Sequence, residues 1–319
     1  MGRTAFILGA GFSAAAGFPL AYGLGERIID FIETDRHSMH AVFLTPGQGY
    51  SNGQFYEGLK LADPRSELAF EELLIKLVSD CEHARDDDPR HTTLRVLRSG
   101  CARLLWKIQN EIDSVPACYE NFAIRFFKDS AARGNSVVTL NWDLIMEKAL
   151  SHAMTPWQYT RSSGAVSILK PHGSINWSSF LANNGCCDYV GWNRIAPQSK
   201  FSYDASHPLQ NPDVDEIHPD FRPMLFPGDP ELPEKECNLK LIWHEVEKAL
   251  DMSETLVFIG YSFPDYDSYA REIFQRYSTR KLIEVYNPSE AYLERSKEIL
   301  GRHTQLFTKK FEDCPYAQV

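Results

Sequence analysis

Short apolar runs followed by polar clusters are the most informative pattern along this chain of 319 residues. Three such runs, residues 4–8, 137–140 and 166–169, lead into Gly9-Ala10-Gly11-Phe12-Ser13, Asn141-Trp142-Asp143 and Lys170-Pro171-His172-Gly173. Apolar runs of this length are typical of strands in a parallel sheet that is covered on both faces. Ligands of such open sheets bind beyond the carboxyl ends of the strands, so these clusters are predicted to meet in one crevice.

The last third of the chain alternates regularly between helical and strand patterns. The predicted elements are helices at 239–250, 267–277 and 289–300, and strands at 255–260, 281–286 and 305–308. Strands that alternate with amphipathic helices predict right-handed crossovers and helices on both faces of the sheet. The expected fold class is therefore α/β, with a Rossmann-like parallel sheet.

Two stretches interrupt this alternation within what we expect to be one catalytic domain, residues 1–319. Residues 34–134 form a predicted helical insert, with helices at 66–79, 92–113 and 117–133, the last closed by Gly134. Residues 183–236 are irregular and rich in Pro, Asn and Asp. They are too long for an ordinary connection, which predicts a small subdomain or a covering loop.

Composition narrows the function classes. The formal net charge of −10 argues against direct nucleic-acid binding and against an anionic membrane surface, because both need a basic face. No apolar stretch approaches the roughly 20 residues that span a bilayer, and no signal peptide is evident, so we expect a cytoplasmic protein. Seven cysteines without paired spacing predict reduced thiols and no metal site.

The first polar cluster fits a phosphate-binding turn. Gly9-x-Gly11-x-x-Ala14 follows a strand and opens a helix, where glycines allow a tight turn and close approach to a pyrophosphate. A tight strand-to-helix turn without any ligand explains the same residues. The acidic ribose ligand of dehydrogenases is expected after a second consecutive strand. Here the helical insert occupies that place, which disfavours a standard dehydrogenase.

The next two clusters carry groups suited to catalysis. Asn141 and Asp143 follow a strand, although either side chain would also cap the helix after it, and Asp143 more readily so. His172 lies beyond the third strand and is a candidate general base, because an unperturbed imidazole with a pKa near 6.5 is largely neutral in cells. Taken alone, each of these residues has a structural explanation as well as a functional one.

Two later strand ends add candidate ligands for a nucleotide. Gly260-Tyr261-Ser262 offers backbone and hydroxyl donors to a phosphate, and Asn287 offers an amide to a ribose. Either position on its own is more often an ordinary loop residue or a helix cap. Their shared position at strand ends is what favours a common site.

Together these clusters resemble the motifs of the sirtuin superfamily, in the same order and over nearly the whole chain. The resemblance extends to Gly173-Ser174-Ile175-Asn176-Trp177 and to Phe263, and it is closest to bacterial sirtuin-like domains of antiviral defence systems. It implies that Asn141 and His172 are catalytic. It also implies that NAD, as the substrate, is bound by Gly9, Ala10, Gly11, Ser13, Asp143, Gly260, Ser262 and Asn287.

The sequence also departs from deacetylating sirtuins. Their Ser-Gly-Ile-Pro-Asp-Phe-Arg segment is replaced by Ala16-Gly17-Phe18-Pro19-Leu20-Ala21-Tyr22, so that only the Gly and the Pro remain. Leu140 stands where family members have a Gln that faces the ribose, and no Cys-x-x-Cys zinc ribbon is present. Chemistry on acyl-lysine is therefore disfavoured, while NAD binding and cleavage remain expected.

The resulting hypothesis is an NAD glycohydrolase that yields nicotinamide and ADP-ribose. We expect Asn141 to hold water or a ribose hydroxyl, Asp143 to bind the nicotinamide carboxamide, and His172 to accept a proton. The resemblance implies a regulated effector of antiphage defence that depletes NAD. Such an effector is expected to act as a homo-oligomer, to depend on a separate sensor or ATPase partner, or to do both. An NAD-dependent protein deacylase and a non-catalytic module that binds NAD or ADP-ribose are the alternatives.

Overall fold

A seven-stranded, all-parallel sheet forms the centre of the molecule. The computed structural model describes residues 2–20, 23–34, 57, 70–85, 88–128, 134–159, 165–175, 180–181, 187–188, 224, 226 and 237–318. The strands are β1 (Thr4–Leu8), β2 (Ser136–Thr139), β3 (Trp157–Gln158), β4 (Val166–Leu169), β7 (Thr255–Ile259), β8 (Leu282–Tyr286) and β9 (Gln305–Phe307). Their order is β3-β4-β2-β1-β7-β8-β9. The predicted α/β, Rossmann-like fold is confirmed.

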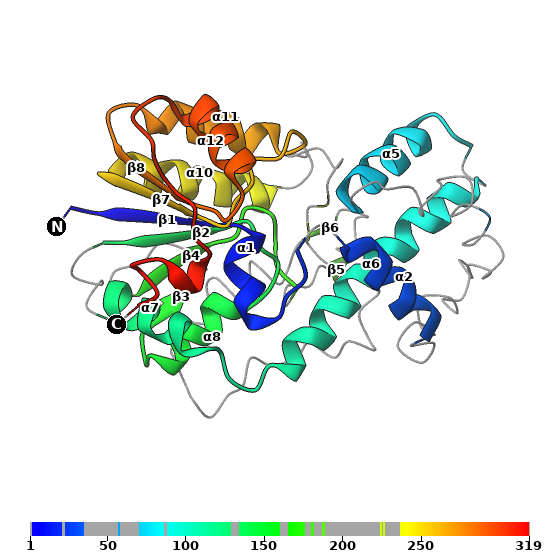
Figure 1. Ribbon diagram of the computed structural model, residues 1–319. Helices are drawn as coiled ribbons and strands as arrows, with labels where there is room; N and C mark the ends of the chain where they lie inside the picture. Colours follow the sequence, from blue (N-terminus) through cyan, green and yellow to red (C-terminus); the bar gives the residue numbers. More distant parts are fainter. Residues whose placement is uncertain are drawn as a thin grey trace.

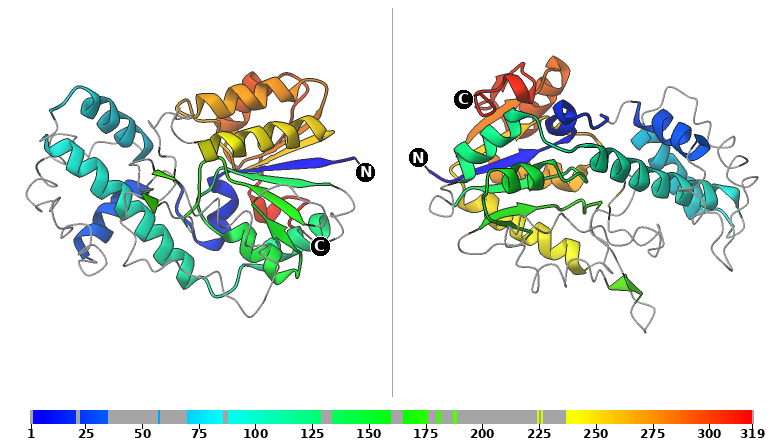
Figure 2. Two further views of the ribbon diagram at one scale, coloured as in Figure 1. Left: turned by 180° about the vertical axis from the view of Figure 1, so that it is seen from behind. Right: turned by 90° about the horizontal axis from the view of Figure 1, so that it is seen from below.

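Helices cover both faces of this sheet, as the apolar strand sequences require. Helices α10 (Cys237–Met252), α11 (Ser268–Ser278) and α12 (Glu290–Leu300) lie on one face, and α7 (Ala117–Phe127) and α8 (Ile145–His152) lie on the other (Figures 1 and 2). Consequently Phe6, Ile7, Leu8, Val257 and Phe258 of the central strands are fully buried. The sheet is the middle layer of a three-layer core.

The strand order changes direction between β1 and β7. In space, β2, β4 and β3 follow one another on one side of β1, whereas β7, β8 and β9 follow on the other side. In open α/β sheets this change of direction leaves a crevice beyond the carboxyl ends of the strands. The crevice is flanked here by the turns that follow β1 and β7.

Three further helices form a layer beside the sheet. Helices α2 (Leu24–Thr34) and α5 (Phe70–Glu82) both pack against the long helix α6 (Pro89–Glu111), away from the strands (Figure 1). We call these three helices the helical layer. Helix α7 instead packs against α8 next to the sheet. The bounds 34–134 for an insert remain a prediction, because much of 35–69 lies outside the described residues.

Helix ends account for most differences from the predicted elements. Helix α6 begins at Pro89 rather than at 92, because the Asp88 carboxylate accepts a hydrogen bond from Arg90 N at 2.9 Å and Pro89 fits the first helical position. Helix α7 ends at Phe127, well before Gly134, although Gly134 has the left-handed φ of +70° expected of a turn glycine. Of residues 183–236, only 187–188, 224 and 226 are described before helix α10 is reached.

An aromatic cluster holds the first turn of the chain against the sheet. Helix α1 (Ala10–Ser13) is followed by a 3-10 turn at Ala14–Ala16, and Phe12 packs edge-on against Tyr119 with ring centroids 5.0 Å apart. The Tyr119 hydroxyl donates to the Phe12 carbonyl. Helix α7 thus fixes the position of the turn after β1. None of the described helices has both the length and the apolar composition needed to cross a membrane.

Candidate functional site

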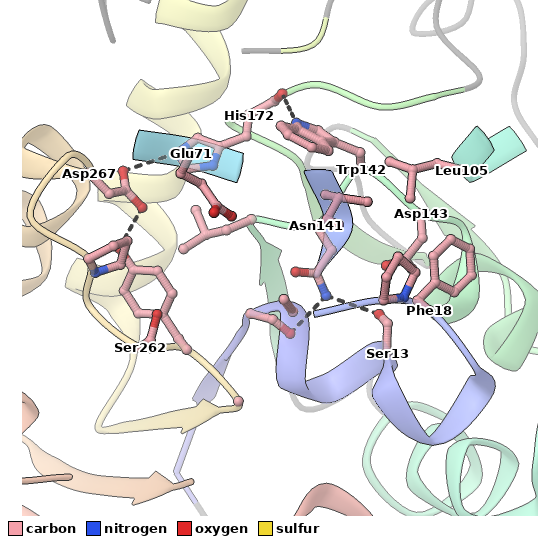
Figure 3. A pocket seen from close by; sticks show the side chains of 18 of the residues that line it. Ser13, Phe18, Glu71, Leu105, Asn141, Trp142, Asp143, His172, Ser262 and Asp267 are labelled. Carbon is pink, nitrogen blue, oxygen red and sulfur yellow. Dashed lines mark hydrogen bonds and ion pairs between the residues drawn. The ribbon is translucent and has the colours of Figure 1, made fainter. Parts of the chain in front are cut away.

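One pocket collects the polar residues from four strand ends. It lies beyond the carboxyl ends of β1, β2, β4 and β7, at the change of strand direction, and its open space is about 1050 Å³ including the mouth. Figure 3 shows the side chains around it. The predicted site residues in its lining are Gly9, Ala10, Ser13, Asn141, Asp143, His172, Gly260 and Ser262.

The glycines of the first turn have a packing role. A Cβ on Gly9 would lie 2.5 Å from Tyr261 Cα, and one on Gly11 would lie 2.8 Å from Gly260 Cα. Gly260 has φ +64°, and its own Cβ would meet Phe12 N at 2.4 Å. The turns after β1 and β7 therefore need glycine in order to touch each other. Gly11 N donates to Gly260 O at 3.0 Å and does not line the pocket.

This packing weakens the helix argument for pyrophosphate binding. Helix α1 has only four residues before the 3-10 turn, so its dipole is small compared with that of a long helix. The exposed Ala10 and the half-buried Ser262 face the pocket from the two turns. Phosphate contacts by these residues stay a prediction.

Asn141 is oriented by two hydrogen bonds from its amide nitrogen. Nδ2 donates to Gly9 O at 2.9 Å and to Ser13 Oγ at 3.0 Å. A carbonyl oxygen only accepts, so the nitrogen must occupy this position and the amide is not flipped. Asn141 Oδ1 therefore faces away from the Gly9 turn (Figure 3). It is an acceptor suited to a water molecule or a ribose hydroxyl.

Asp143 performs the capping role that was the simpler explanation for it. Its Oδ1 accepts from Ile145 N at 3.0 Å, at the start of α8. Burial raises the pKa of the Asp143 carboxyl, and the positive charge of Lys170 opposes that shift. A direct contact of either Ser13 or Asp143 with a ligand stays a prediction.

The His172 loop is attached to the Asn141 loop through Trp142. Trp142 Nε1 donates to the His172 carbonyl at 3.0 Å, and the Trp142 carbonyl accepts from Ile175 N at 3.0 Å. The Trp142 ring also packs against Phe226, with centroids 5.0 Å apart. These contacts fix the distance between the two loops that carry the candidate catalytic residues.

A buried ion pair stabilises the two loops that carry Asn141 and His172. Lys170 and Glu147 are both fully buried, and Lys170 Nζ lies 3.0 Å from Glu147 Oε1. Lys170 Nζ also donates to the Asp143 carbonyl, and the Tyr159 hydroxyl donates to Glu147 Oε1 at 3.2 Å. Burial raises the pKa of the Glu147 carboxyl, against the effect of Lys170.

His172 has an acidic partner that the sequence patterns did not reveal. His172 Nε2 lies 3.2 Å from Asp267 Oδ1, and the Tyr261 hydroxyl donates to Asp267 Oδ2. Because a carboxylate only accepts hydrogen bonds, Asp267 favours a proton on His172 Nε2. Asp267 comes from the loop after β7, so the pair joins opposite walls of the pocket (Figure 3).

Asp267 was predicted only as the first residue of a helix. It is the N-cap residue of α11, but its side chain makes no capping hydrogen bond and turns to His172 instead. Nothing in the sequence distinguishes the two uses of an Asp at this position. Glu71 and Tyr266 also line the pocket and were not predicted as site residues.

Asn287 makes structural contacts outside the pocket lining. Its Nδ2 donates to the Tyr261 carbonyl at 3.3 Å, and its Oδ1 accepts from Ser289 N at 3.0 Å, next to helix α12. Both ends of the side chain are therefore occupied within the protein. A ribose contact by Asn287 stays a prediction, and the loop role that was its alternative accounts for these bonds.

Comparison with known proteins adds a similarity of fold. No protein-family model matches the sequence, and no curated protein matches it either. Similar solved structures include a Sir2 homologue in complex with NAD (13% identity, 97% of this chain and 84% of that chain, TM-score 0.43). A complex of Sir2 with a p53 peptide and NAD+ (14%, 97% and 88%, 0.42) and a Sir2 enzyme structure (12%, 98% and 88%, 0.44) are also similar. At these values the similarity says nothing about activity.

Proposed function

We propose that this protein is an NAD glycohydrolase, which converts NAD+ and water to nicotinamide and ADP-ribose. One observation carries the proposal: Asn141 Oδ1 and the His172 ring come from neighbouring strand ends, and both residues line one pocket. The two bonds from Asn141 Nδ2 and the contact of His172 with Asp267 hold these groups in place. An oriented acceptor and a base are what hydrolysis at a ribose carbon requires.

The reaction breaks the bond between the ribose anomeric carbon and the nicotinamide nitrogen. The electron pair of that bond goes to the nicotinamide ring, which becomes neutral, and positive charge develops on the ribose. Asn141 Oδ1 accepts a hydrogen bond from the attacking water or from a ribose hydroxyl. The water oxygen then bonds to the anomeric carbon, and His172 accepts the proton that is released. Asp267 stabilises the resulting imidazolium.

The charge of the pocket agrees with this chemistry. Its described lining includes the carboxyl groups of Glu71, Asp143 and Asp267 but no Lys or Arg. Acidic groups favour the positively charged nicotinamide ring and the cationic transition state. The phosphates of NAD are then left to neutral donors, of which Ala10 and Ser262 are the candidates at the mouth.

The motif resemblance in the sequence extends the proposal to a regulated effector of antiphage defence. Cleavage of NAD without control would be lethal to the cell that makes the protein, so activity requires a trigger. A homo-oligomer, a separate sensor or an ATPase partner is the source we propose for that trigger. Direct nucleic-acid or membrane binding forms no part of the proposal, given the net charge of −10.

Two substitutions test the function. Asn141→Ala and His172→Ala should each lower NAD turnover by about 1000-fold or more, because each removes a group that acts on the reacting atoms. Nicotinamide release by the purified protein and the NAD content of cells that express it are the measurements. Asn110→Ala and His152→Ala, at exposed positions of α6 and α8, are the matched controls and should behave as wild type.

Other results would favour the alternatives. Nicotinamide release that depends on an acyl-lysine peptide would identify a deacylase. Tight NAD binding without cleavage, in the purified protein and in cells, would identify a binding module. Full activity in either the Asn141 or the His172 variant would refute the assigned roles.

A further inference from the structure

Glu71 is a buried carboxylate in the pocket that the proposed mechanism does not yet use. Glu71 lies in the first turn of α5, in the helical layer, and is 9% exposed. It nevertheless lines the same pocket as Asn141 and His172, and its side chain points between them (Figure 3). The helical layer therefore contributes a charged group to a site that otherwise belongs to the sheet.

The described polar neighbour of the Glu71 carboxyl is the Tyr266 hydroxyl and not a cation. Tyr266 stands next to Asp267 in the loop after β7, and its hydroxyl is a neighbour of the Glu71 carboxyl in the pocket. No Lys, Arg or His whose side chain the structure describes forms an ion pair with Glu71. Burial raises the pKa of the Glu71 carboxyl, consistent with a charge that lacks compensation. Such a group is costly to keep unless a ligand supplies the missing charge.

The nicotinamide riboside portion of NAD+ supplies that charge. Its ring carries a full positive charge before cleavage, and the ribose carries it as the bond breaks. A carboxylate is the group that favours both states, whereas the neutral dihydronicotinamide ring of NADH offers it no charge. The phosphates of NAD would be repelled by Glu71, which places the riboside end, and not the adenosine end, next to α5.

We propose that Glu71 is a third substrate-contacting side chain, which binds the nicotinamide ribose and stabilises its developing positive charge. This inference rests on the proposed glycohydrolase function and adds a residue, a charge preference and an orientation of NAD to it. It also gives the helical layer a part in catalysis. With Asn141 on one side of the ribose, Glu71 completes the acceptors for its hydroxyl groups.

Glu71→Gln is the sharpest test, because glutamine keeps the size and shape of the side chain and removes only the charge. We expect kcat for NAD cleavage to fall by about 100-fold with KM changed less than about threefold, as for other groups that act on transition-state charge. The binding preference for NAD+ over NADH should shrink by about tenfold, while the affinity for ADP-ribose should stay within about twofold.

Two matched variants separate catalysis from folding. Glu72→Gln removes an exposed carboxylate from the same helical turn and should leave all of these values unchanged. Tyr266→Phe removes the neighbouring hydroxyl but keeps the Glu71 charge, so it should retain the preference for NAD+. Equal losses in the Glu71 and Tyr266 variants, without a change in that preference, would show that Glu71 only joins α5 to the sheet.

The outcomes also distinguish this inference from the function on which it rests. If the wild type cleaves NAD and Glu71→Gln does so at the wild-type rate, the Glu71 role is refuted and the function stands. If the wild type binds NAD without cleaving it, the preference between NAD+ and NADH decides the Glu71 role alone. If it neither binds nor cleaves NAD, both are refuted.

Discussion

At the sheet edge, Asn141, Asp143 and His172 are each held by several partners, whereas across the pocket the described polar neighbour of Glu71 in the helical layer is the Tyr266 hydroxyl. The loops of the sheet edge are joined through Ser13, Trp142 and the Lys170–Glu147 pair. Helix α5 reaches the pocket through the contact of Glu71 with Tyr266. The two walls thus differ in how firmly they hold their polar groups.

This difference teaches which part of the site is preorganised. Groups that must be placed to within a fraction of an ångström lie where the backbone of four strand ends fixes them. A carboxylate that acts through its charge tolerates looser placement, because electrostatic energy falls slowly with distance. The helical layer is therefore the side of the pocket on which changes of position would alter activity without disturbing the sheet.

Removal of the buried ion pair should have the largest effect on the firmly held wall. Lys170→Met leaves Glu147 buried without its cation, which we expect to lower the free energy of unfolding by about 3–5 kcal/mol. Urea denaturation followed by circular dichroism measures the change. The loss should also disorder the Asn141 and His172 loops, because Lys170 Nζ supports the Asp143 carbonyl.

An exposed pair provides the control for that prediction. Lys248 and Glu245 of α10 lie 2.7 Å apart, and the Lys248 side chain is 46% exposed. Lys248→Met should change the free energy of unfolding by less than about 1 kcal/mol. If the Lys170 and Lys248 variants were equally stable, the buried pair would not be what holds the sheet-edge wall.

The firm wall was the more predictable one from sequence. Apolar strands followed by Gly9, Asn141, His172 and Gly260 place these residues at one edge of a parallel sheet, and the structure brings them into one pocket. Two arguments are enough for this prediction: the apolar pattern identifies the strands, and ligands of open parallel sheets bind beyond the carboxyl ends of the strands. Both arguments need only local sequence and strand topology. The close contact between the turns after β1 and β7 could not be predicted, since it depends on how two distant backbones meet.

Substitution of Asp267 tests whether the pocket wall after β7 takes part in catalysis. Asp267→Asn should lower kcat by about 100-fold, because an amide cannot stabilise the imidazolium of His172 as a carboxylate does. The limb of the pH–rate profile that belongs to His172 should move to lower pH, which a purely structural role would not cause. Steady-state kinetics between about pH 5 and about pH 9 measure both effects.

A neighbouring carboxylate in the same loop is the matched control. Asp265 is exposed and pairs with Arg271 at 2.6 Å, outside the pocket lining. Asp265→Asn removes the same charge two residues away and should leave kcat and the pH profile unchanged. An unchanged profile in Asp267→Asn as well would mean that His172 does not depend on this carboxylate.

Residues such as Glu71 and Asp267 escaped prediction for a physical reason. Glu71 is one of two adjacent glutamates at the start of a helix, where acidic residues are common and ordinarily exposed. Only the packing of α5 against α6 decides that Glu71 faces the pocket and Glu72 faces solvent. Asn287 and Asp143 match a ligand pattern and also hydrogen-bond backbone groups, so the sequence pattern alone does not separate a ligand role from a structural one.

The smallest predicted effect concerns stability and needs no ligand. Burial raises the pKa of the Glu71 carboxyl above its ordinary value of 4.5, so the folded protein binds that proton more tightly than the unfolded chain does. This proton stabilises the folded protein fully at pH values below the pKa of Glu71 in the unfolded chain. The stabilisation is lost as the pH rises through the pKa of Glu71 in the folded protein. The Glu71→Gln variant has no carboxyl group at this position, so this loss of stability does not occur in it. The variant should therefore gain stability relative to wild type as the pH rises from about 4 to about 7.

Urea denaturation of both proteins over that pH range measures the difference in their free energies of unfolding. The contributions of Asp143 and Glu147 cancel in this difference, because both proteins contain them. Glu72→Gln, which removes an exposed carboxylate from the same helical turn, is the matched control. A Glu71 variant that is less active but more stable at neutral pH would show that the carboxylate is kept for its ligand and not for the fold. A variant destabilised at every pH would instead place Glu71 among the groups that hold the helical layer to the sheet.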